Sequence, residues 1–303
     1  MTCFMTCFMT RLRSVVRARH WIERSVCAPG MGLLRATASG ALLALAMGCG
    51  PWVSIASAED GRSAFDTVVV DAGHGGEDHG ARSPGGLAEK EIVLDVSRRL
   101  AARLRAQGLS VKLTRQDDRF VPLETRTSLA NAAGADLFVS VHANSAATAR
   151  PRGVETYFVS LDASDAGAGR LARRENSAFA GEPSLAAAAD PLAALLGDLV
   201  VTEHVHESSE FAKLVQGELA GLGGGDVRGV KQAPFVVLMG VEMPAALVEI
   251  GFLSNAEDAG ELRSARHREA IADSITRAVV AFGRRYDARR GVEQGILGLR
   301  AAR

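Results

Sequence analysis

Short apolar segments that end in polar, metal-binding side chains constrain the fold of this chain most strongly. Residues 68–70 are three consecutive valines, and His74 follows in a turn that contains Gly73, Gly75 and Gly76. A run of β-branched residues suits a strand buried on both faces, as in the centre of an α/β sheet. The glycines give the backbone conformations closed to other residues and let a ligand approach closely. We therefore expect His74 at the carboxyl edge of a sheet, where open α/β sheets bind ligands.

Two further segments repeat this arrangement. The apolar run that starts at residue 136 ends in His142, and the run 245–252 carries Glu249 among apolar residues. The ends of neighbouring parallel strands lie roughly 5 Å apart, so two imidazoles placed there could share one metal ion. A carboxylate is rarely buried unless it is paired or bound to a metal, although an acid satisfied by hydrogen bonds remains the alternative for Glu249.

The order of the remaining patterns predicts one α/β domain over residues 66–286. Apolar periodicity indicates helices at residues 87–106, 123–133, 208–219 and 267–286. Strands are expected after the first valine run at residues 109–114, 136–144, 153–160, 227–230, 234–239 and 245–250. Strands that alternate with helices imply right-handed crossovers. We predict a twisted, largely parallel or mixed sheet of about six strands flanked by helices, and a flexible tail at residues 287–303.

The composition excludes some functions and limits the ligands of a metal site. The 303 residues include 35 basic and 35 acidic side chains. No basic patch interleaved with aromatic residues is visible, so we expect no nucleic-acid partner. All four cysteines, at positions 3, 7, 27 and 49, precede residue 50. A metal site in the body of the protein must therefore use histidine and carboxylate ligands. We also expect a monomer.

The first 58 residues have the pattern of an export signal. An arginine-containing region precedes the apolar core 40–47, and residues 56–58, Ala-Ser-Ala, supply the small residues of a cleavage site. The apolar run is too short to span a membrane permanently. Residues 59–65 are then a short linker, and the protein is expected in the periplasm or cell envelope. A lipid anchor on Cys49 is the alternative.

Residues 163–208 differ in composition from the segments around them. They are rich in Ala, Leu, Glu and Asp, and residues 171–176 and 191–201 are separate helical candidates. We interpret this segment as a helical insertion in the domain. His204 and His206 lie within it two residues apart, so on a helix they point to different faces and make a poor pair of metal ligands. His79, in the polar loop after the glycine turn, is expected on the surface.

Two imidazoles and a carboxylate that leave one position open for water are a common plan for catalytic zinc. Zinc lowers the pKa of bound water to about 7 and polarises a carbonyl group. A glutamate that does not bind the metal can move the proton of the water to a leaving amine. Glu89 is the carboxylate nearest in sequence to His74, although an acid in the first turn of a helix is also favourable for electrostatic reasons alone. The residues support a zinc-dependent hydrolase of an amide or ester.

Five motifs in order resemble the zinc-dependent N-acetylmuramoyl-L-alanine amidases over about residues 66–286. They are residues 70–76 (VDAGHGG), 89–90 (EK), 113–115 (LTR), 140–144 (SVHAN) and 248–255 (VEIGFLSN). The resemblance implies that His74, Glu89 and His142 bind one Zn²⁺ ion and that Glu249 is the general base. It further implies that the substrate is peptidoglycan. The bond cleaved would be the amide between the lactyl group of N-acetylmuramic acid and L-alanine.

The resemblance extends to residues 163–208. In the branch of the family that separates daughter cells, a helical segment at this place covers the site and supplies a carboxylate to the metal. An activator protein, of the LytM-like kind, displaces it. Residues 171–176 (LARREN) are similar to that segment. Our hypothesis is that residues 163–208 are autoinhibitory through Glu175, with Glu182, Glu203 and Glu207 as other candidates. A helical hairpin without a regulatory effect is the alternative.

Two other functions remain open at the level of the sequence. A zinc peptidase that acts within the stem peptide would share the metal site and differ only in its products. A catalytically inactive peptidoglycan-binding or regulatory protein is the second. Such a protein would be expected to have lost Glu249 or one of the metal-binding residues. The metal is also open, because sites of histidine and glutamate accept several first-row ions.

Overall fold

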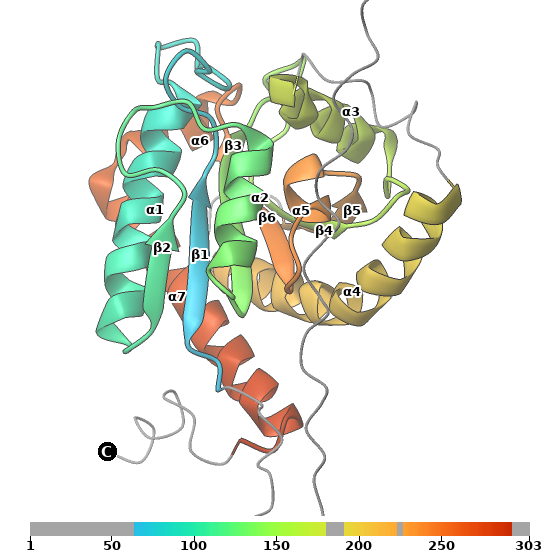
Figure 1. Cartoon of the computed structure of the whole chain (residues 1–303). Helices are drawn as coiled ribbons and strands as arrows, with labels where there is room; N and C mark the ends of the chain where they lie inside the picture. Colours follow the sequence, from blue (N-terminus) through green and yellow to red (C-terminus); the bar gives the residue numbers. More distant parts are fainter. Residues whose placement is uncertain (1–63, 180–190, 223–226, 293–303) are drawn as a thin grey trace, which may run out of the picture. The chain divides into compact units, whose positions relative to one another are not determined.

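Six strands form one mixed sheet in the order β2-β1-β3-β6-β4-β5 (Figure 1). The structure is a computed structural model that describes residues 64–179, 191–222 and 227–292. The strands are β1 (Thr67–Ala72), β2 (Ser110–Leu113), β3 (Leu137–Asn144), β4 (Val154–Val159), β5 (Val227–Ala233) and β6 (Ala245–Phe252). β2, β1, β3 and β6 are parallel, whereas β4 is antiparallel to β6 and parallel to β5. The expected α/β class and largely parallel sheet are confirmed.

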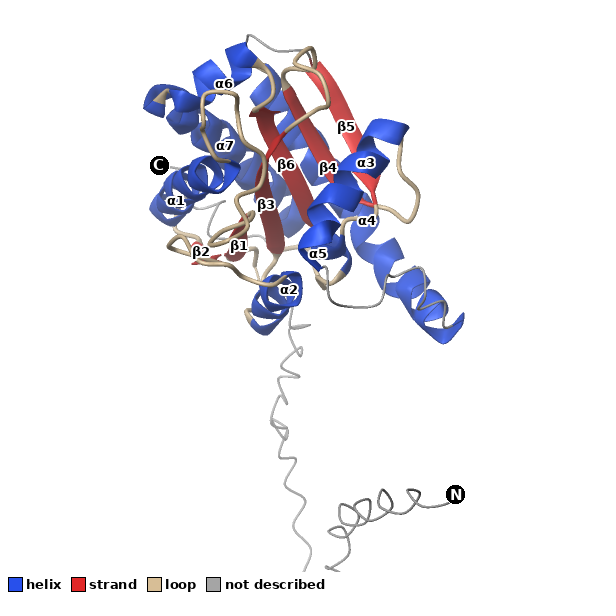
Figure 2. Ribbon diagram, turned by 90° about the horizontal axis from the view of Figure 1, so that it is seen from above, coloured by secondary structure: helices blue, strands red, loops and turns tan. Residues whose placement is uncertain are grey.

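Helices cover both faces of this sheet (Figure 2). They are α1 (Glu89–Ala106), α2 (Leu123–Ala132), α3 (Ala166–Glu175), α4 (Pro191–Ala220), α5 (Val236–Met239), α6 (Ala256–Arg263) and α7 (Ala265–Arg289), with a 3₁₀ turn at Asn176–Phe179. Side chains of α1, α4 and α7 pack with one face of the sheet. Side chains of α2, α3 and α5 pack with the other. The second face is the one that carries the polar residues of interest.

Alternation along the strands explains why these polar residues share a face. In β3, Val139 and Val141 belong to the core under α1 and α7, whereas Phe138 belongs to the opposite core. Successive strand residues point to opposite faces, so His142 lies on the same face as Phe138. In β6, Glu249 shares a face with Leu247 for the same reason. The register places His142 directly beside Glu249.

The expected strand at residues 234–239 is wrong, because this segment forms the short helix α5. Its apolar run fits either a strand or a buried helix, which periodicity alone does not separate. Tertiary contacts decide the conformation here. The Val236 amide donates to Asn176 Oδ1 at 2.9 Å, and Phe235, Val237 and Leu238 are buried in the core.

The helices expected at residues 191–201 and 208–219 are one continuous helix, α4. No glycine or proline stands between them to end the first. The segment 163–208, expected to be a helical insertion, therefore contains α3, its 3₁₀ turn and the beginning of α4 among its described residues. α7 continues to Arg289, and buried Asp287 accepts a hydrogen bond from the Phe65 amide at 2.7 Å. The tail thus begins later than residue 287.

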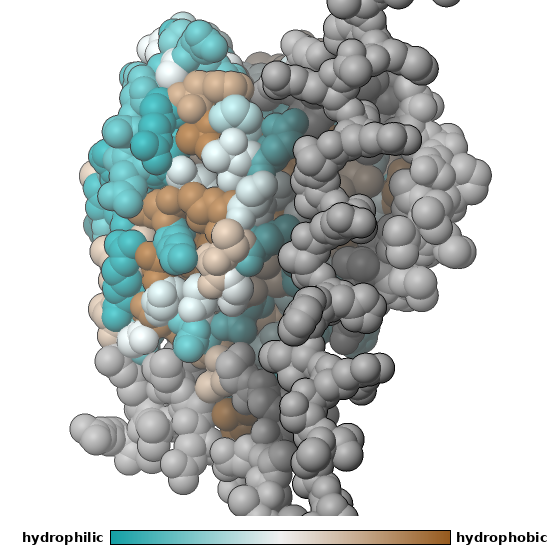
Figure 3. All heavy atoms as spheres, viewed as in Figure 1, coloured by the Kyte–Doolittle hydropathy of each residue, from teal (hydrophilic) through white to brown (hydrophobic). Residues whose placement is uncertain are grey.

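The export signal, residues 59–63 of the linker and residues 293–303 of the tail lie outside the described residues. Within the described ranges, no helix combines the length and apolar character needed to cross a membrane. The outer face of α1 is hydrophilic in Figure 3 and carries the exposed side chains of Glu91, Arg98 and Arg105.

Candidate metal centre

His74 stands just beyond the carboxyl end of β1 in an unusual backbone conformation. Its φ angle is 59°, the only positive value at a non-glycine residue in the described part of the chain. Gly73, before it, has no room for a side chain, because a Cβ would lie 2.4 Å from the His142 ring. The two imidazole rings therefore approach to 4.9 Å between their centroids. The glycine turn predicted from the sequence serves this close approach.

Two buried arginines hold the turn in place. Arg115 donates to the carbonyl oxygens of Ala72 and Gly73 at 2.9 and 2.7 Å. Arg126 donates to Ala72 at 2.6 Å and to the His74 carbonyl at 2.8 Å. A sparsely populated conformation persists only where its surroundings fix it, and these contacts do so. Sequence reasoning did not identify Arg126, because nothing in its local pattern shows which turn it reaches.

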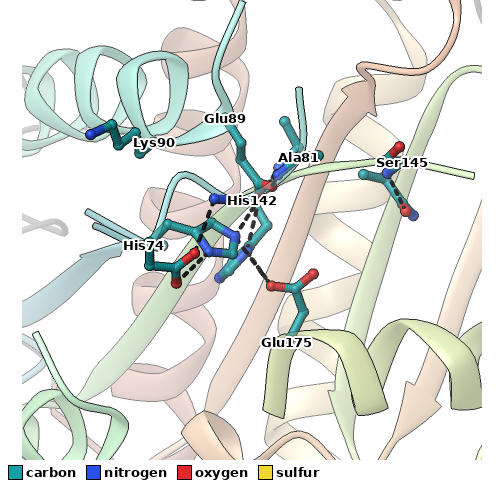
Figure 4. A network of polar contacts seen from close by, with 12 residues as sticks. His74, Ala81, Glu89, Lys90, His142, Ser145 and Glu175 are labelled. Carbon is teal, nitrogen blue, oxygen red and sulfur yellow. Dashed lines mark hydrogen bonds and ion pairs between the residues drawn. The ribbon is translucent and has the colours of Figure 1, made fainter. Parts of the chain in front are cut away.

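Glu89 begins α1 and is fully buried between the two histidines. Its Oε1 lies 3.0 Å from His74 Nε2 and 3.1 Å from His142 Nδ1 (Figure 4). Its Oε2 accepts a hydrogen bond from the Ala81 amide at 2.7 Å. A carboxylate that only complemented the helix dipole would face solvent. The position of Glu89 instead suits a metal ligand.

Glu175, the last residue of α3, reaches the same point from the other side. Its Oε2 lies 3.2 Å from both His74 Nε2 and His142 Nδ1 (Figure 4). Its other oxygen accepts from Arg174 at 2.9 Å. Glu207, another candidate of the insertion, instead lies 3.4 Å from Arg289. Glu182 and the side chain of Glu203 lie outside the described residues.

The ligand atoms of His74, Glu89, His142 and Glu175 all lie within 4.8 Å of one another. His74 Nε2 and Glu175 Oε2 are buried and make no hydrogen bond within the described structure. Zinc with bonds of 2.0–2.1 Å separates tetrahedral ligands by roughly 3.3 Å, close to the contacts observed here. The residues therefore fit a zinc ion, and other first-row ions with the same donor set.

The charges of this cluster favour protonated histidines in the absence of metal. Burial lowers the pKa of His74, but Glu89, Asp78 and Glu175 outweigh it and raise that pKa to about 12. Burial likewise opposes protonation of His142, whereas Glu175 and Glu89 raise its pKa to about 9. A metal ion must displace these protons to bind.

Glu249 lies beside the cluster without joining it. It is fully buried, and neither of its carboxylate oxygens has a hydrogen-bond partner in the described part of the chain. Burial raises the pKa of its carboxyl well above the usual range. This is an environment in which a carboxyl group can take up and release a proton.

The remaining histidines of interest lie away from this centre. His79 and His206 are exposed, as expected for His79. His204 Nδ1 lies 3.7 Å from Glu207 on α4. Among the described residues, only the group around His74 brings metal-binding side chains close enough together to hold an ion.

Comparison with known families agrees with this geometry. The model of the family described as N-acetylmuramoyl-L-alanine amidase matches residues 68–281. The chain belongs to the N-acetylmuramoyl-L-alanine amidase family. That match covers all five motifs and the residues His74, Glu89, His142, Glu175 and Glu249.

Individual amidases show how far the similarity extends. The amidase AmiC of Neisseria meningitidis is 37% identical over 71% of this chain and 52% of its own length. The amidase AmiA of Escherichia coli is 35% identical over 73% of this chain and 77% of its own length. The chain thus spans about half of the first relative and about three quarters of the second. The structure of the amidase AmiC2 of Nostoc punctiforme has a TM-score of 0.54 and 29% identity, covering 73% of this chain and 98% of that one.

Proposed function

We propose that this protein hydrolyses the amide bond between N-acetylmuramic acid and L-alanine in peptidoglycan. The single observation that carries the proposal is the cluster of His74, Glu89 and His142 beside the unpaired carboxyl of Glu249. Membership of the amidase family supports the substrate and the bond. Zinc is the proposed ion, held by the two histidines and Glu89.

The chemistry expected of zinc at this site is activation of water and polarisation of the scissile carbonyl. Glu249 accepts the proton that the water loses as its oxygen bonds to the carbonyl carbon. Glu249 then donates this proton to the nitrogen of L-alanine as the carbon–nitrogen bond breaks. A raised pKa brings the carboxyl closer to neutral pH, where general acid–base catalysts are most effective. The products are the glycan with a free lactyl carboxylate and a stem peptide with a free amino terminus.

We also propose that α3 inhibits this activity. A catalytic zinc site keeps one position open for water or substrate, whereas a structural site is closed by four protein ligands. Glu175 contacts both histidines and would supply a fourth protein ligand to a zinc ion held there. Displacement of α3 would open that position, which is the role proposed for a LytM-like activator. This regulation is the property of the cell-separating amidases that residues 171–176 resemble.

Export to the periplasm or cell envelope is part of the same proposal. Peptidoglycan lies outside the cytoplasmic membrane, so an enzyme that cleaves it must be exported. The export signal expected at residues 1–58 would provide for this. The test is whether the mature protein, fractionated from its host, begins near residue 59.

Product analysis tests the activity and its inhibition together. The purified protein, Glu175→Ala and Glu249→Gln are incubated with dye-labelled peptidoglycan, with zinc or with a chelator. We expect release of stem peptides that begin with L-alanine, greater for Glu175→Ala, strongly reduced by Glu249→Gln and abolished by chelator. A point substitution is preferable to deletion of α3, because Ala168, Leu171 and Ala172 are buried in the core.

The alternative functions give different results. Peptides that do not begin with L-alanine would identify a stem-peptide peptidase. No release by any folded, zinc-loaded variant would identify a binding or regulatory protein. Equal activity of the wild type and Glu175→Ala would refute inhibition by Glu175 while leaving the amidase proposal intact.

A further inference from the structure

A cavity of about 470 Å³ lies beside the metal centre. It is lined by residues from the end of β3, the strands β4 and β5, and α3. Its charged lining is mainly cationic. The charged residues are Arg170, Arg174, Arg228 and Lys231 against the two carboxylates of Glu155 and Asp165. A cavity with this excess of cations suits an anionic group of a ligand.

Glu155, at the base of the cavity, positions two of these cations. Its Oε1 accepts from Arg228 Nε at 2.7 Å and from Lys231 Nζ at 2.9 Å. Its Oε2 accepts from Tyr157 and Asn144 at 2.6 and 3.1 Å. Both oxygens of Glu155 are therefore hydrogen-bonded, and Glu155 holds the side chains of Arg228 and Lys231 in place. The Nη atoms of Arg228 make no hydrogen bond with any described residue, so they remain available to a ligand.

One side chain of α3, that of Arg174, lines both this cavity and the cavity at the metal centre. Another cavity of about 440 Å³ is lined by His74 and Glu175, and Arg174 and Ser145 line both cavities. Arg174 donates to the Ser145 carbonyl at 2.6 Å, so this contact lies where the two cavities meet. Figure 4 shows Ser145 on the segment that follows the His142 strand, to the side of the metal-binding residues. Displacement of α3 would therefore join the two cavities into one groove.

α3 presents a carboxylate at each end of this groove. Glu175 lies at the histidines, and Asp165 Oδ2 lies 3.2 Å from Lys231 Nζ. Glu175 is ten positions after Asp165, which corresponds to a rise of about 15 Å between their Cα atoms along the helix. An extended peptide covers that distance with roughly four residues. The spacing matches a substrate whose scissile carbonyl is at the metal and whose carboxylate is three to four residues further along.

We propose that Lys231 and Arg228 form a subsite for a carboxylate in the distal half of the stem peptide, and that Asp165 occupies this subsite while α3 is docked. The inference rests on the proposed amidase function and adds to it a determinant of substrate specificity. In this arrangement α3 imitates the substrate at two points, its Glu175 at the metal and its Asp165 at the cations.

Paired substrates test the subsite. Two synthetic N-acetylmuramoyl-tetrapeptides are compared, one with free carboxylates and one with carboxamides at the third and fourth residues. The full chain carries Glu175→Ala, and kcat and KM are measured for release of each peptide. We expect KM for the free carboxylate to be on the order of tenfold lower, the effect of one charge-assisted contact. Lys231→Met should raise KM for the free carboxylate and so reduce this preference.

Two further variants sharpen the test. Asp165→Ser keeps a residue able to cap α3 but removes the charge that competes for Lys231, so KM should fall for the free carboxylate alone. Lys112→Met, an exposed lysine of the edge strand β2, is the matched control and should change neither value. Equal KM values for the two substrates in the starting protein would overturn the subsite, even if Lys231→Met failed to fold. Absence of cleavage of both substrates would instead refute the amidase function.

Discussion

Glu249 is a buried acid, and its substitution should lower catalysis without destabilising the fold. Both carboxylate oxygens lack a hydrogen-bond partner among the described residues. Glu249→Gln keeps the shape of the side chain and removes its ability to carry a proton. We expect peptide release to fall by roughly 10²- to 10⁴-fold, the usual contribution of general acid–base catalysis. Zinc affinity and the thermal midpoint should be unchanged or slightly higher, as measured by metal competition and thermal denaturation.

Glu155 is the matched control for this substitution. It is buried on the same face of the sheet and lies directly opposite Glu249 in the register of β4 and β6. Its carboxylate is fully hydrogen-bonded, so Glu155→Gln should cost on the order of 1–3 kcal/mol of unfolding free energy. A comparable loss of stability in Glu249→Gln would show that Glu249 has a structural role instead.

Zinc binding at the two histidines should release protons. The pKa values of about 12 for His74 and about 9 for His142 mean that both rings are protonated at pH 7 without metal. Ligation requires the neutral rings, so about two protons should leave per ion and the affinity should weaken as the pH falls. Titration calorimetry in buffers of different ionisation enthalpy measures this number. Release of less than one proton would contradict the charge state inferred here.

Individual site residues differed in how far the sequence could predict them. The positions of His74, His142 and Glu249 follow from apolar strands that end in polar residues, a local pattern. Glu89 could be chosen over the helix-dipole alternative only through the resemblance to a family. Arg126 and Glu155 could not be found from local patterns. Arg126 contacts Ala72, which is 54 residues away in the sequence, and Glu155 contacts Lys231, which is 76 residues away. Such contacts depend on the tertiary structure.

At the level of elements, Asn176 fastens α3 to α5. Its amide donates to the Pro234 carbonyl at 2.8 Å and accepts from the Val236 amide at 2.9 Å. Asn176→Ala breaks both contacts next to Glu175. We expect the end of α3 to loosen and basal peptide release to rise several-fold, with a stability cost of about 1–2 kcal/mol. Dye release and urea denaturation measure the two effects.

Asn131 offers a control with the same pattern of bonds elsewhere. It donates to the Gly240 carbonyl at 2.9 Å and accepts from the Glu242 amide at 3.0 Å, joining α2 to the segment after α5. Asn131→Ala should lose similar stability without a gain in activity. If both variants became equally active, general loosening of the fold would explain the result and Asn176 would have no specific role.

The same contact explains why one element was assigned wrongly. Residues 234–239 are apolar and partly β-branched, so their composition favours a strand. Asn176, from a different part of the chain, caps the backbone at Val236 and permits a helical turn. The length of α4 could not be predicted from composition, because the composition changes near residue 208 whereas no glycine or proline in residues 202–207 ends the helix.

The architecture of the whole domain was predictable because its core follows local alternation. Strand residues on the two faces sort into two apolar cores. Parallel pairing of β1, β3 and β6 then brings their carboxyl ends together without further information. The direction of β4 was not predictable, because antiparallel pairing with β6 leaves the pattern of buried residues in β4 unchanged.

The stability of the whole domain should depend on Asp71 in acid. Burial raises its pKa, but Arg126 and the hydroxyls of Thr114 and Ser140 outweigh burial and hold the pKa below its usual value. A carboxyl with a lowered folded-state pKa stabilises the fold above its unfolded pKa of about 3.9, and this contribution is lost as the pH falls through the folded value. Asp71→Asn should therefore flatten the decline of unfolding free energy below about pH 4.

At pH 7, Asp71→Asn should cost about 3–5 kcal/mol, because it leaves the buried charge of Arg126 without its partner. Asp273→Asn is the control, since its pairs with Arg103 and Arg277 lie at the surface and each such pair contributes at most about 1 kcal/mol. Urea denaturation of the three proteins between pH 3 and pH 7 measures both effects. Parallel pH profiles for Asp71→Asn and the wild type would mean that acid unfolds the domain through other carboxylates. The hydrogen bonds of Arg126 to the His74 turn would then not depend on the charge of Asp71.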